Sequence, residues 1–190
     1  MSLINLVDNT LTDKNTYHSY LETYDQLFSS KKLSARRVME IGIAHGGSIK
    51  LWRDYFENAE IYGLDIMTKE TIKNLNVVLN NLFELDRVKL FTGVDAYNSN
   101  FYNIFLEENI KFDIIVDDGP HTIESLKVFL KNYSKMLSEN GIIVIEDVQS
   151  IGWFSILQKE LPEELQSKLK LYDLRYVKNK YDDILIVLEK

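Results

Sequence analysis

Four acids and one histidine stand where this chain could do chemistry. Two of the acids end a predicted buried strand and two end the next one; they are Asp117, Asp118, Glu146 and Asp147. His121 follows the first pair closely in the sequence. Because neighbouring parallel strands lie ~5 Å apart and end at the same edge of a sheet, we expect these side chains to converge.

Carboxylates at such close range repel one another, and each raises the pKa of its neighbour. A divalent cation between them removes this repulsion. Oxygen ligands favour Mg²⁺, Mn²⁺ or Ca²⁺ over zinc, and the chain has no cysteine to supply a thiolate. We therefore predict a metal site at Asp118, Glu146 and Asp147. The alternative, that these acids cap helices or face water, is acceptable for one of them and less satisfactory for all three.

His121 is the predicted catalytic base beside this metal site. An imidazole titrates near neutrality and can accept a proton from a hydroxyl group. A neighbouring cation lowers the pKa of that hydroxyl and orients its oxygen. A lone histidine is more often structural than catalytic, so the prediction depends on the metal beside it.

A second candidate site begins at a glycine-rich turn. The apolar run from Val38 to Ile43 enters a cluster of small residues, after which helical spacing resumes. This pattern predicts a strand, a tight turn and a helix start whose backbone N–H groups face a ligand. The residues predicted to line it are Glu40, Gly42, Gly46, Gly47 and Ser48.

The turn differs from the common phosphate-binding loops. No Lys-Ser/Thr pair follows its glycines, and Ala44 stands where a dinucleotide fingerprint has its second glycine. Ser48 is expected to cap the helix. Asp65 ends the next predicted strand, where a carboxylate can hold a ribose diol. Together these features indicate a nucleoside without a pyrophosphate, whereas a lone glycine turn would also suit plain chain geometry.

Strands and helices alternate five times along the chain and a hairpin follows. This order predicts a doubly wound, mostly parallel α/β fold with every strand ending at one edge. Predicted strands run from Val38 to Ile43, Ala59 to Asp65, Arg87 to Phe91, Phe112 to Asp117 and Gly141 to Asp147. Predicted helices run from Asp13 to Ser30, Ile72 to Leu85, Asn100 to Asn109, Thr122 to Leu137 and Leu157 to Leu171. The antiparallel hairpin is expected from Leu171 to Val177 and from Ile184 to Leu188.

The composition limits the class of protein. A chain of 190 residues, 45% hydrophobic and with 2 prolines, suits one compact domain, residues 1–190. Its net charge of −7 argues against a duplex nucleic-acid partner, which needs clustered Lys and Arg. Neither a signal peptide nor a membrane-spanning run is recognisable, so no membrane partner and a cytoplasmic location are expected. The sequence leaves open whether the chain forms a homo-oligomer.

The glycine turn and Asp65 resemble the class I S-adenosylmethionine (SAM) methyltransferases. In that family an E-x-G-x-x-x-G turn and the acid of the next strand hold the cofactor. The resemblance implies a seven-stranded sheet with one antiparallel strand. It also implies that Asp95, after the third strand, lies near the adenine, although an ordinary turn aspartate would fit equally well. Asp117 is assigned to the cofactor as well.

The run from Phe112 to His121 and the pair Glu146-Asp147 resemble the D-D-G-x-H and E-D motifs of the macrocin O-methyltransferase-like family. Its members are metal-dependent sugar O-methyltransferases. The resemblance implies SAM and Mg²⁺ as cofactors and a small-molecule or glycan acceptor. Pro120 departs from the family pattern, which usually has a small polar residue there.

The N-terminal segment, residues 1–33, resembles a lid in the same family, where a T-D-K…H-x-Y pattern covers cofactor and substrate. Lys14, His18 and Tyr20 carry that pattern and could contact a ligand. Two alternatives to sugar methylation are a catechol-type small-molecule O-methyltransferase and a non-catalytic module that binds SAM. Intact glycines and acids count against the module.

Overall fold

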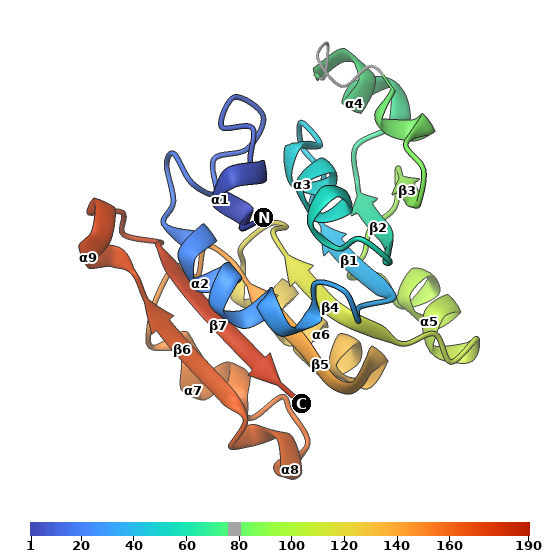
Figure 1. The fold of residues 1–190 in the computed structure, drawn as a ribbon. Coiled ribbons are helices and arrows are strands. Elements are labelled where there is room, and N and C mark those ends of the chain that lie inside the picture. The colour runs from blue at the N-terminus through green and yellow to red at the C-terminus, as the bar shows by residue number, and fades with distance from the viewer. Residues whose placement is uncertain (76–80) are drawn as a thin grey trace. The chain divides into compact units, whose positions relative to one another are not determined.

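The computed structural model describes residues 1–75 and 81–190. These residues form two compact units, Met1–Asp95 and Ala96–Lys190, which we call unit 1 and unit 2 (Figure 1). Each unit combines parallel strands with helices, so the predicted alternation of strands and helices is confirmed within both.

Unit 1 has three strands, β1 (Arg37–Ile41), β2 (Glu60–Asp65) and β3 (Val88–Thr92), in the order β3-β2-β1. All are parallel, with Ile41 opposite Leu64 and Asp65 opposite Thr92. Almost every residue of β1 and β2 is buried, as expected for parallel strands covered on both faces. Because β1 and β2 run in register, Glu40 and Asp65 come close to the same end of this sheet.

The helices of unit 1 pack through aromatic side chains. Tyr24 and Phe28 contact Trp52 with ring centroids 5.6 and 5.9 Å apart, and Phe28 also contacts Phe56. All four rings are completely buried. These contacts join α2 (Tyr20–Phe28) to α3 (Gly47–Tyr55); the other helices are α1 (Leu3–Leu6), α4 (Lys69–Leu75) and two 3-10 turns, Ser29–Lys31 and Leu82–Glu84.

The predicted helix from Asp13 to Ser30 is shorter in the structure, because α2 begins at Tyr20. The Asp13 carbonyl accepts hydrogen bonds from the N–H groups of Thr16, Tyr17 and His18, which makes a compact turn instead of a helix. This turn lets Lys14 bury its side chain inside unit 1. The helix was predicted from aromatic residues at helical spacing that begin with Tyr17. Tyr17 is exposed, so this buried aromatic face begins only at Tyr20.

The predicted helix from Ile72 to Leu85 is also shorter. α4 begins earlier, at Lys69, and is described as far as Leu75, while Leu82–Glu84 form a separate 3-10 turn. Val78 and Leu79, which the sequence placed on the inner face of this helix, lie outside the described residues.

Unit 2 has four strands, β4 (Phe112–Asp117), β5 (Leu137–Ile145), β6 (Leu169–Asp173) and β7 (Ile184–Glu189), in the order β4-β5-β7-β6. β4 and β5 are parallel, with Asp117 opposite Ile145, and β7 is antiparallel to both of its neighbours. The predicted antiparallel hairpin is therefore confirmed, and Figure 1 shows β6 and β7 side by side. Its first strand was predicted too far along the chain, from Leu171 to Val177, because Arg175–Lys178 form the short helix α9. The seven strands belong to a doubly wound, mostly parallel α/β fold, as predicted.

Helices of unit 2 differ from the prediction mainly after β5. The expected helix from Leu157 to Leu171 is wrong: α7 (Trp153–Gln158) and α8 (Glu163–Gln166) stand in its place, and β6 begins at Leu169. Pro162 causes the break, because proline has no N–H to continue a helix and its ψ of 144° is extended. The other helices are α5 (Ser99–Glu107), α6 (Ile123–Tyr133), the 3-10 turn Ser134–Met136 and α9 (Arg175–Lys178).

The predicted helix from Thr122 to Leu137 stops at Tyr133, and β5 already starts at Leu137 instead of Gly141. Thr122 is the N-cap of α6 and forms a capping box with Ser125, which fixes where the helix begins. Among the helices described, none is long and apolar enough to cross a membrane.

Candidate functional site

The glycine turn of unit 1 has a left-handed backbone at several positions. Gly42 and Gly46 have φ of 93° and 80°, and Ala44 between them has φ of 41°. Glycine adopts these angles without strain, whereas an L residue such as Ala44 does so at a cost of about 1–2 kcal/mol. The turn carries the chain from β1 into α3, whose N-cap is Gly46. Within the turn, the Gly42 N–H donates to the Leu64 carbonyl and the Gly46 N–H donates to the Ile43 carbonyl, so these groups hold the turn itself.

Asp65 holds this turn in place. Its Oδ2 accepts hydrogen bonds from the N–H groups of Ile43, at 2.7 Å, and Ala44, at 3.2 Å, while its Oδ1 accepts one from Met67 at 2.7 Å. The residue is 8% exposed. A carboxylate oxygen has more than one acceptor site, so Asp65 can still receive hydroxyl donors such as those of a ribose. The arrangement fits the cofactor role that the sequence predicted.

Glu40 is completely buried at the end of β1. The Ser48 hydroxyl donates to its Oε2 at 2.6 Å, and Lys14 Nζ lies 3.3 Å from its Oε1. Lys14 is 1% exposed, so this is an ion pair inside unit 1. The prediction that Ser48 caps α3 is wrong, because its hydroxyl points to Glu40 and the N-cap position belongs to Gly46.

Gly47 contacts the N-terminal segment. A Cβ atom at this position would lie 2.2 Å from the carbonyl oxygen of Leu11, so only glycine fits. Leu11 therefore covers the start of α3 at Gly47, and the segment around it packs directly on the glycine turn. The sequence assigned Gly47 to the cofactor, and that role stays a prediction.

The structure separates the N-terminal residues that the sequence had grouped. Lys14 pairs with Glu40, whereas the buried ring of His18 stacks on Tyr20 with centroids 4.8 Å apart. Asp95 is exposed after β3. Whether these residues contact a ligand remains a prediction, but Lys14 has a defined partner that sequence spacing did not identify.

Unit 2 brings two of the predicted metal ligands to the predicted base. His121 Nε2 lies 3.7 Å from Asp118 Oδ1 and 3.6 Å from Asp147 Oδ2. One ligand atom from each of the three residues lies within 4.8 Å of the others. Their side chains are 24%, 27% and 17% exposed, in that order, so the cluster is open to solvent. Two carboxylates beside an imidazole fit a divalent cation that prefers oxygen ligands.

This cluster, which we call the acidic elbow (Asp118, His121 and Asp147), has a strained backbone. His121 and Asp147 have φ of 49° and 51°. Of the seven non-glycine residues with positive φ in the described chain, three are asparagine, which tolerates this region. The other four are Ala44, Arg87, His121 and Asp147, so three of these four lie in the two candidate sites. Such strain gathers where a structure must aim particular side chains.

The other two predicted site acids of unit 2, Asp117 and Glu146, are buried. Asp117 accepts hydrogen bonds at Oδ1 from the Tyr97 hydroxyl, at 2.9 Å, and from the Gly119 N–H, at 3.2 Å. Burial raises the pKa of Asp117 to about 6, although these two donors oppose the shift. Glu146 is 2% exposed and its N–H donates to the Asp117 carbonyl. Its side chain is not one of the three in the acidic elbow, so its assignment as a metal ligand stays a prediction.

Sequence reasoning missed Tyr97, whose hydroxyl holds Asp117. It also missed the left-handed backbone at His121 and Asp147. Histidine and aspartate adopt this region more often than most residues do, but most histidines and aspartates do not, so residue type alone could not locate it. The only sign for Tyr97 was its place two positions after Asp95, in the connection that leads away from β3.

Comparison with known families finds a match to the model described as "Methyltransferase domain", over residues 32–186. This range includes the glycine turn, Asp65 and all of the acidic elbow. It covers most of the chain, and therefore most of both units.

Curated relatives with significant similarity include two O-methyltransferases. Mycinamicin VI 2''-O-methyltransferase of Micromonospora griseorubida is 28% identical over 143 residues, 72% of this chain and 33% of the relative. Demethylmacrocin O-methyltransferase of Streptomyces fradiae is 28% identical over 156 residues, 78% of this chain and 36% of the relative. The chain thus spans about a third of the length of these relatives.

Among solved structures, the MycE methyltransferase of the mycinamycin biosynthetic pathway, in complex with Mg and SAH, has a similar fold. The TM-score is 0.75 at 22% identity, over 100% of this chain and 55% of that one. A caffeoyl-CoA O-methyltransferase from Staphylococcus aureus, described as putative, gives a TM-score of 0.57 at 16% identity, over 89% of this chain and 82% of that one. Both likenesses concern the fold.

Proposed function

We propose that this chain, which belongs to the methyltransferase domain family, is a SAM-dependent enzyme that methylates a hydroxyl group of a sugar or glycosylated natural product with the help of a divalent cation. The observation that carries the proposal is the acidic elbow. It sets one imidazole nitrogen 3.6–3.7 Å from two carboxylates that are partly exposed.

In the proposed reaction each member of the elbow has a distinct part. Asp118 and Asp147 hold a cation, for which Mg²⁺ is the first candidate and Mn²⁺ or Ca²⁺ are alternatives. His121 Nε2 accepts the proton of the acceptor hydroxyl, which a nearby cation makes more acidic. Glu146 is proposed as a further metal ligand. The remaining contribution is alignment of the hydroxyl with the methyl group that SAM supplies.

For unit 1 we propose the cofactor site. Asp65 accepts from the ribose hydroxyls, and the glycines of the turn let the rest of the cofactor lie against the backbone. Asp95 is proposed as a further cofactor contact. The assignment of Asp117, a residue of unit 2, to the cofactor stays a prediction from the sequence. Residues 1–33 are proposed to cover this site, a role supported by the contact between Leu11 and Gly47 and by the ion pair between Lys14 and Glu40.

The sugar acceptor is supported by the name of one similar enzyme, 8-demethyl-8-alpha-L-rhamnosyl tetracenomycin-C 2'-O-methyltransferase of Streptomyces olivaceus, which is 28% identical over 75% of this chain. The cation is supported by the similar MycE structure, which contains Mg and SAH. At 28% identity over 36% of the relative's length, this name suggests the acceptor class and leaves the individual acceptor to experiment.

The test is a labelled-methyl transfer assay with purified chain, SAM, and matched panels of glycosides and catechols, each with Mg²⁺ and with excess EDTA. The proposal predicts label on glycosides only when Mg²⁺ is present. Transfer of the label to catechols alone would contradict the sugar acceptor and favour the catechol-type alternative. SAM binding without transfer to either panel would favour a non-catalytic module.

A further inference from the structure

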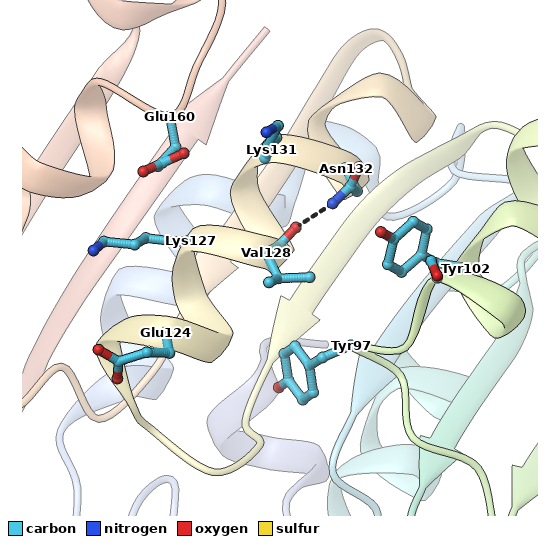
Figure 2. Close-up of a pocket in the computed structure, with 9 residues that line it drawn as sticks. Tyr97, Tyr102, Glu124, Lys127, Val128, Lys131, Asn132 and Glu160 are labelled. Carbon is cyan, nitrogen blue, oxygen red and sulfur yellow. Dashed lines mark hydrogen bonds between the residues drawn. The ribbon is translucent and has the colours of Figure 1, made fainter.

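Tyr97 of unit 2 takes part in two features of the structure, an open groove and the support of a buried aspartate. The residue lines the groove beside α6, together with Tyr102, Val128 and Asn132 (Figure 2). Its hydroxyl donates to Asp117 Oδ1 at 2.9 Å. Asp117 is completely buried and directly precedes Asp118 of the acidic elbow.

The Tyr97 hydroxyl also leaves no room for a side chain on Gly119. A Cβ atom on Gly119 would lie 2.1 Å from Tyr97 Oη, far closer than two such atoms can approach, and 3.3 Å from Asp117 Oδ1. The Gly119 N–H donates to that oxygen at 3.2 Å. Gly119 has no left-handed backbone to explain its presence. The Tyr97 hydroxyl therefore occupies the place of a side chain on the residue after Asp118.

The backbone next to Tyr97 is held by a second tyrosine, Tyr133. The hydroxyl of Tyr133, a fully buried residue of α6, donates to the Ala96 carbonyl at 2.7 Å. The ring of Tyr133 also contacts Tyr102 edge to face. Tyr97 thus connects an anchored stretch of chain to the turn formed by Asp117, Asp118 and Gly119.

Two donors engage Asp117 Oδ1, whereas its buried Oδ2 receives no hydrogen bond from any described residue. If Oδ1 lost the Tyr97 hydroxyl, the carboxylate could rotate toward a better partner, and the attached Asp118 would move with the turn. Partners of this kind orient the residues that bind a metal and are usually worth a 10–100-fold change in its affinity.

We propose that Tyr97 is a positioning residue for the metal site: its hydroxyl, fitted over Gly119, holds Asp117 so that Asp118 is aimed at the cation. This inference rests on the proposed function, because it requires a cation at the acidic elbow. It adds a residue that contacts neither the cation nor the substrate in that proposal.

The experiment measures Mn²⁺ binding by electron paramagnetic resonance for the parent chain and for Tyr97→Phe, with Tyr102→Phe as the matched control. Tyr102 lines the same groove, but its hydroxyl makes no hydrogen bond to a described residue. Tyr97→Phe should weaken Mn²⁺ binding by about 10-fold or more, and the Mg²⁺ concentration for half-maximal methyl transfer should rise in parallel. Tyr102→Phe should bind Mn²⁺ like the parent.

Gly119→Ala provides a second, independent route, because its new methyl group must displace the Tyr97 hydroxyl while the ring stays in place. It should weaken Mn²⁺ binding in the parent and add little in the Tyr97→Phe background, where the clashing oxygen is gone. Should Tyr97→Phe fail to fold, Gly119→Ala alone still decides the matter.

Parental Mn²⁺ affinity in both Tyr97→Phe and Gly119→Ala would overturn this inference alone. A parent chain that binds no Mn²⁺ would overturn the proposed metal site, and this inference with it. Equal weakening by Tyr97→Phe and Tyr102→Phe would assign the effect to the groove as a whole and would also overturn the role of Tyr97.

Discussion

Glu40 and Asp65 of unit 1 differ from the two acids of the acidic elbow in how deeply they are buried. Glu40 is completely buried between a serine hydroxyl and a lysine ammonium, and Asp65 accepts three backbone N–H groups. Asp118 and Asp147 instead have side chains that are 27% and 17% exposed and share one imidazole.

This difference in burial fits two different roles for the carboxylates. A buried carboxylate that is surrounded by donors of its own chain is held in one orientation, which suits a fixed contact with an organic cofactor. Carboxylates that lie close together and are partly exposed gain most from an external cation. This contrast supports the proposals that unit 1 holds the cofactor and that the elbow of unit 2 binds a cation and accepts a proton.

The largest expected effect is at the elbow. His121→Ala should lower turnover about 10²–10⁴-fold, the usual contribution of a positioned base, with cofactor affinity unchanged. His121→Gly is the matched control for the backbone, because glycine suits the φ of 49° better than alanine does. Equal losses in both variants, measured as single-turnover rates, would assign the effect to the ring. Turnover within a few-fold of the parent would make His121 structural.

The largest effect on folding is expected in unit 1. Lys14→Met should lower the free energy of unfolding by about 3–5 kcal/mol, because Glu40 would be left buried without its cation. The double variant Lys14→Met with Glu40→Gln should recover much of this loss, since it removes both charges. Urea denaturation followed by circular dichroism measures both. A double variant as unstable as the single one would show that the ion pair is not the source of the loss.

Removal of a single metal ligand should raise the Mg²⁺ concentration that the enzyme needs. Asp118→Asn should raise the Mg²⁺ concentration for half-maximal rate by at least about 10–100-fold, the loss expected even for a residue that only supports a ligand. Asp113→Asn, on the same strand β4, is the matched control, since its carboxylate accepts from Ser138 away from the elbow. The same Mg²⁺ requirement in both variants would exclude Asp118 as a ligand.

A smaller effect is expected at the cofactor. Asp65→Ala should weaken SAM binding by about 1.5–3 kcal/mol, the value of a lost hydrogen bond to a charged group. Calorimetry in EDTA measures this without interference from the elbow. Unchanged affinity would remove Asp65 from the cofactor site and would weaken the contrast between the two regions.

The fold was largely predictable because most of its strands are short runs of apolar residues, which can be recognised in the sequence. The start of β4 at Phe112 was located correctly, and the antiparallel hairpin was found although α9 takes the place of the end of its predicted first strand. The errors fall where a tertiary contact or a single proline overrides helical spacing. Lys14 turns toward Glu40 and shortens α2, and Pro162 divides the predicted last helix.

The candidate sites were predictable to the extent that topology alone fixes them. Asp118 and Asp147 meet because β4 and β5 are parallel neighbours, which alternation of strands and helices implies. The partners of those acids were not predictable in the same way. The bond from Tyr97 to Asp117 joins residues 20 positions apart, and the bond from Lys14 to Glu40 depends on an irregular turn, so neither follows from a repeat or a motif.

The most direct measurement of the central claim is one labelled-methyl transfer reaction on a glycoside acceptor, started in excess EDTA and then supplied with excess Mg²⁺. Because the elbow is proposed to work only with a cation while unit 1 holds SAM without one, we predict no transfer in EDTA, although SAM is bound, and full transfer once Mg²⁺ is added. Full transfer before Mg²⁺ is added would contradict the account.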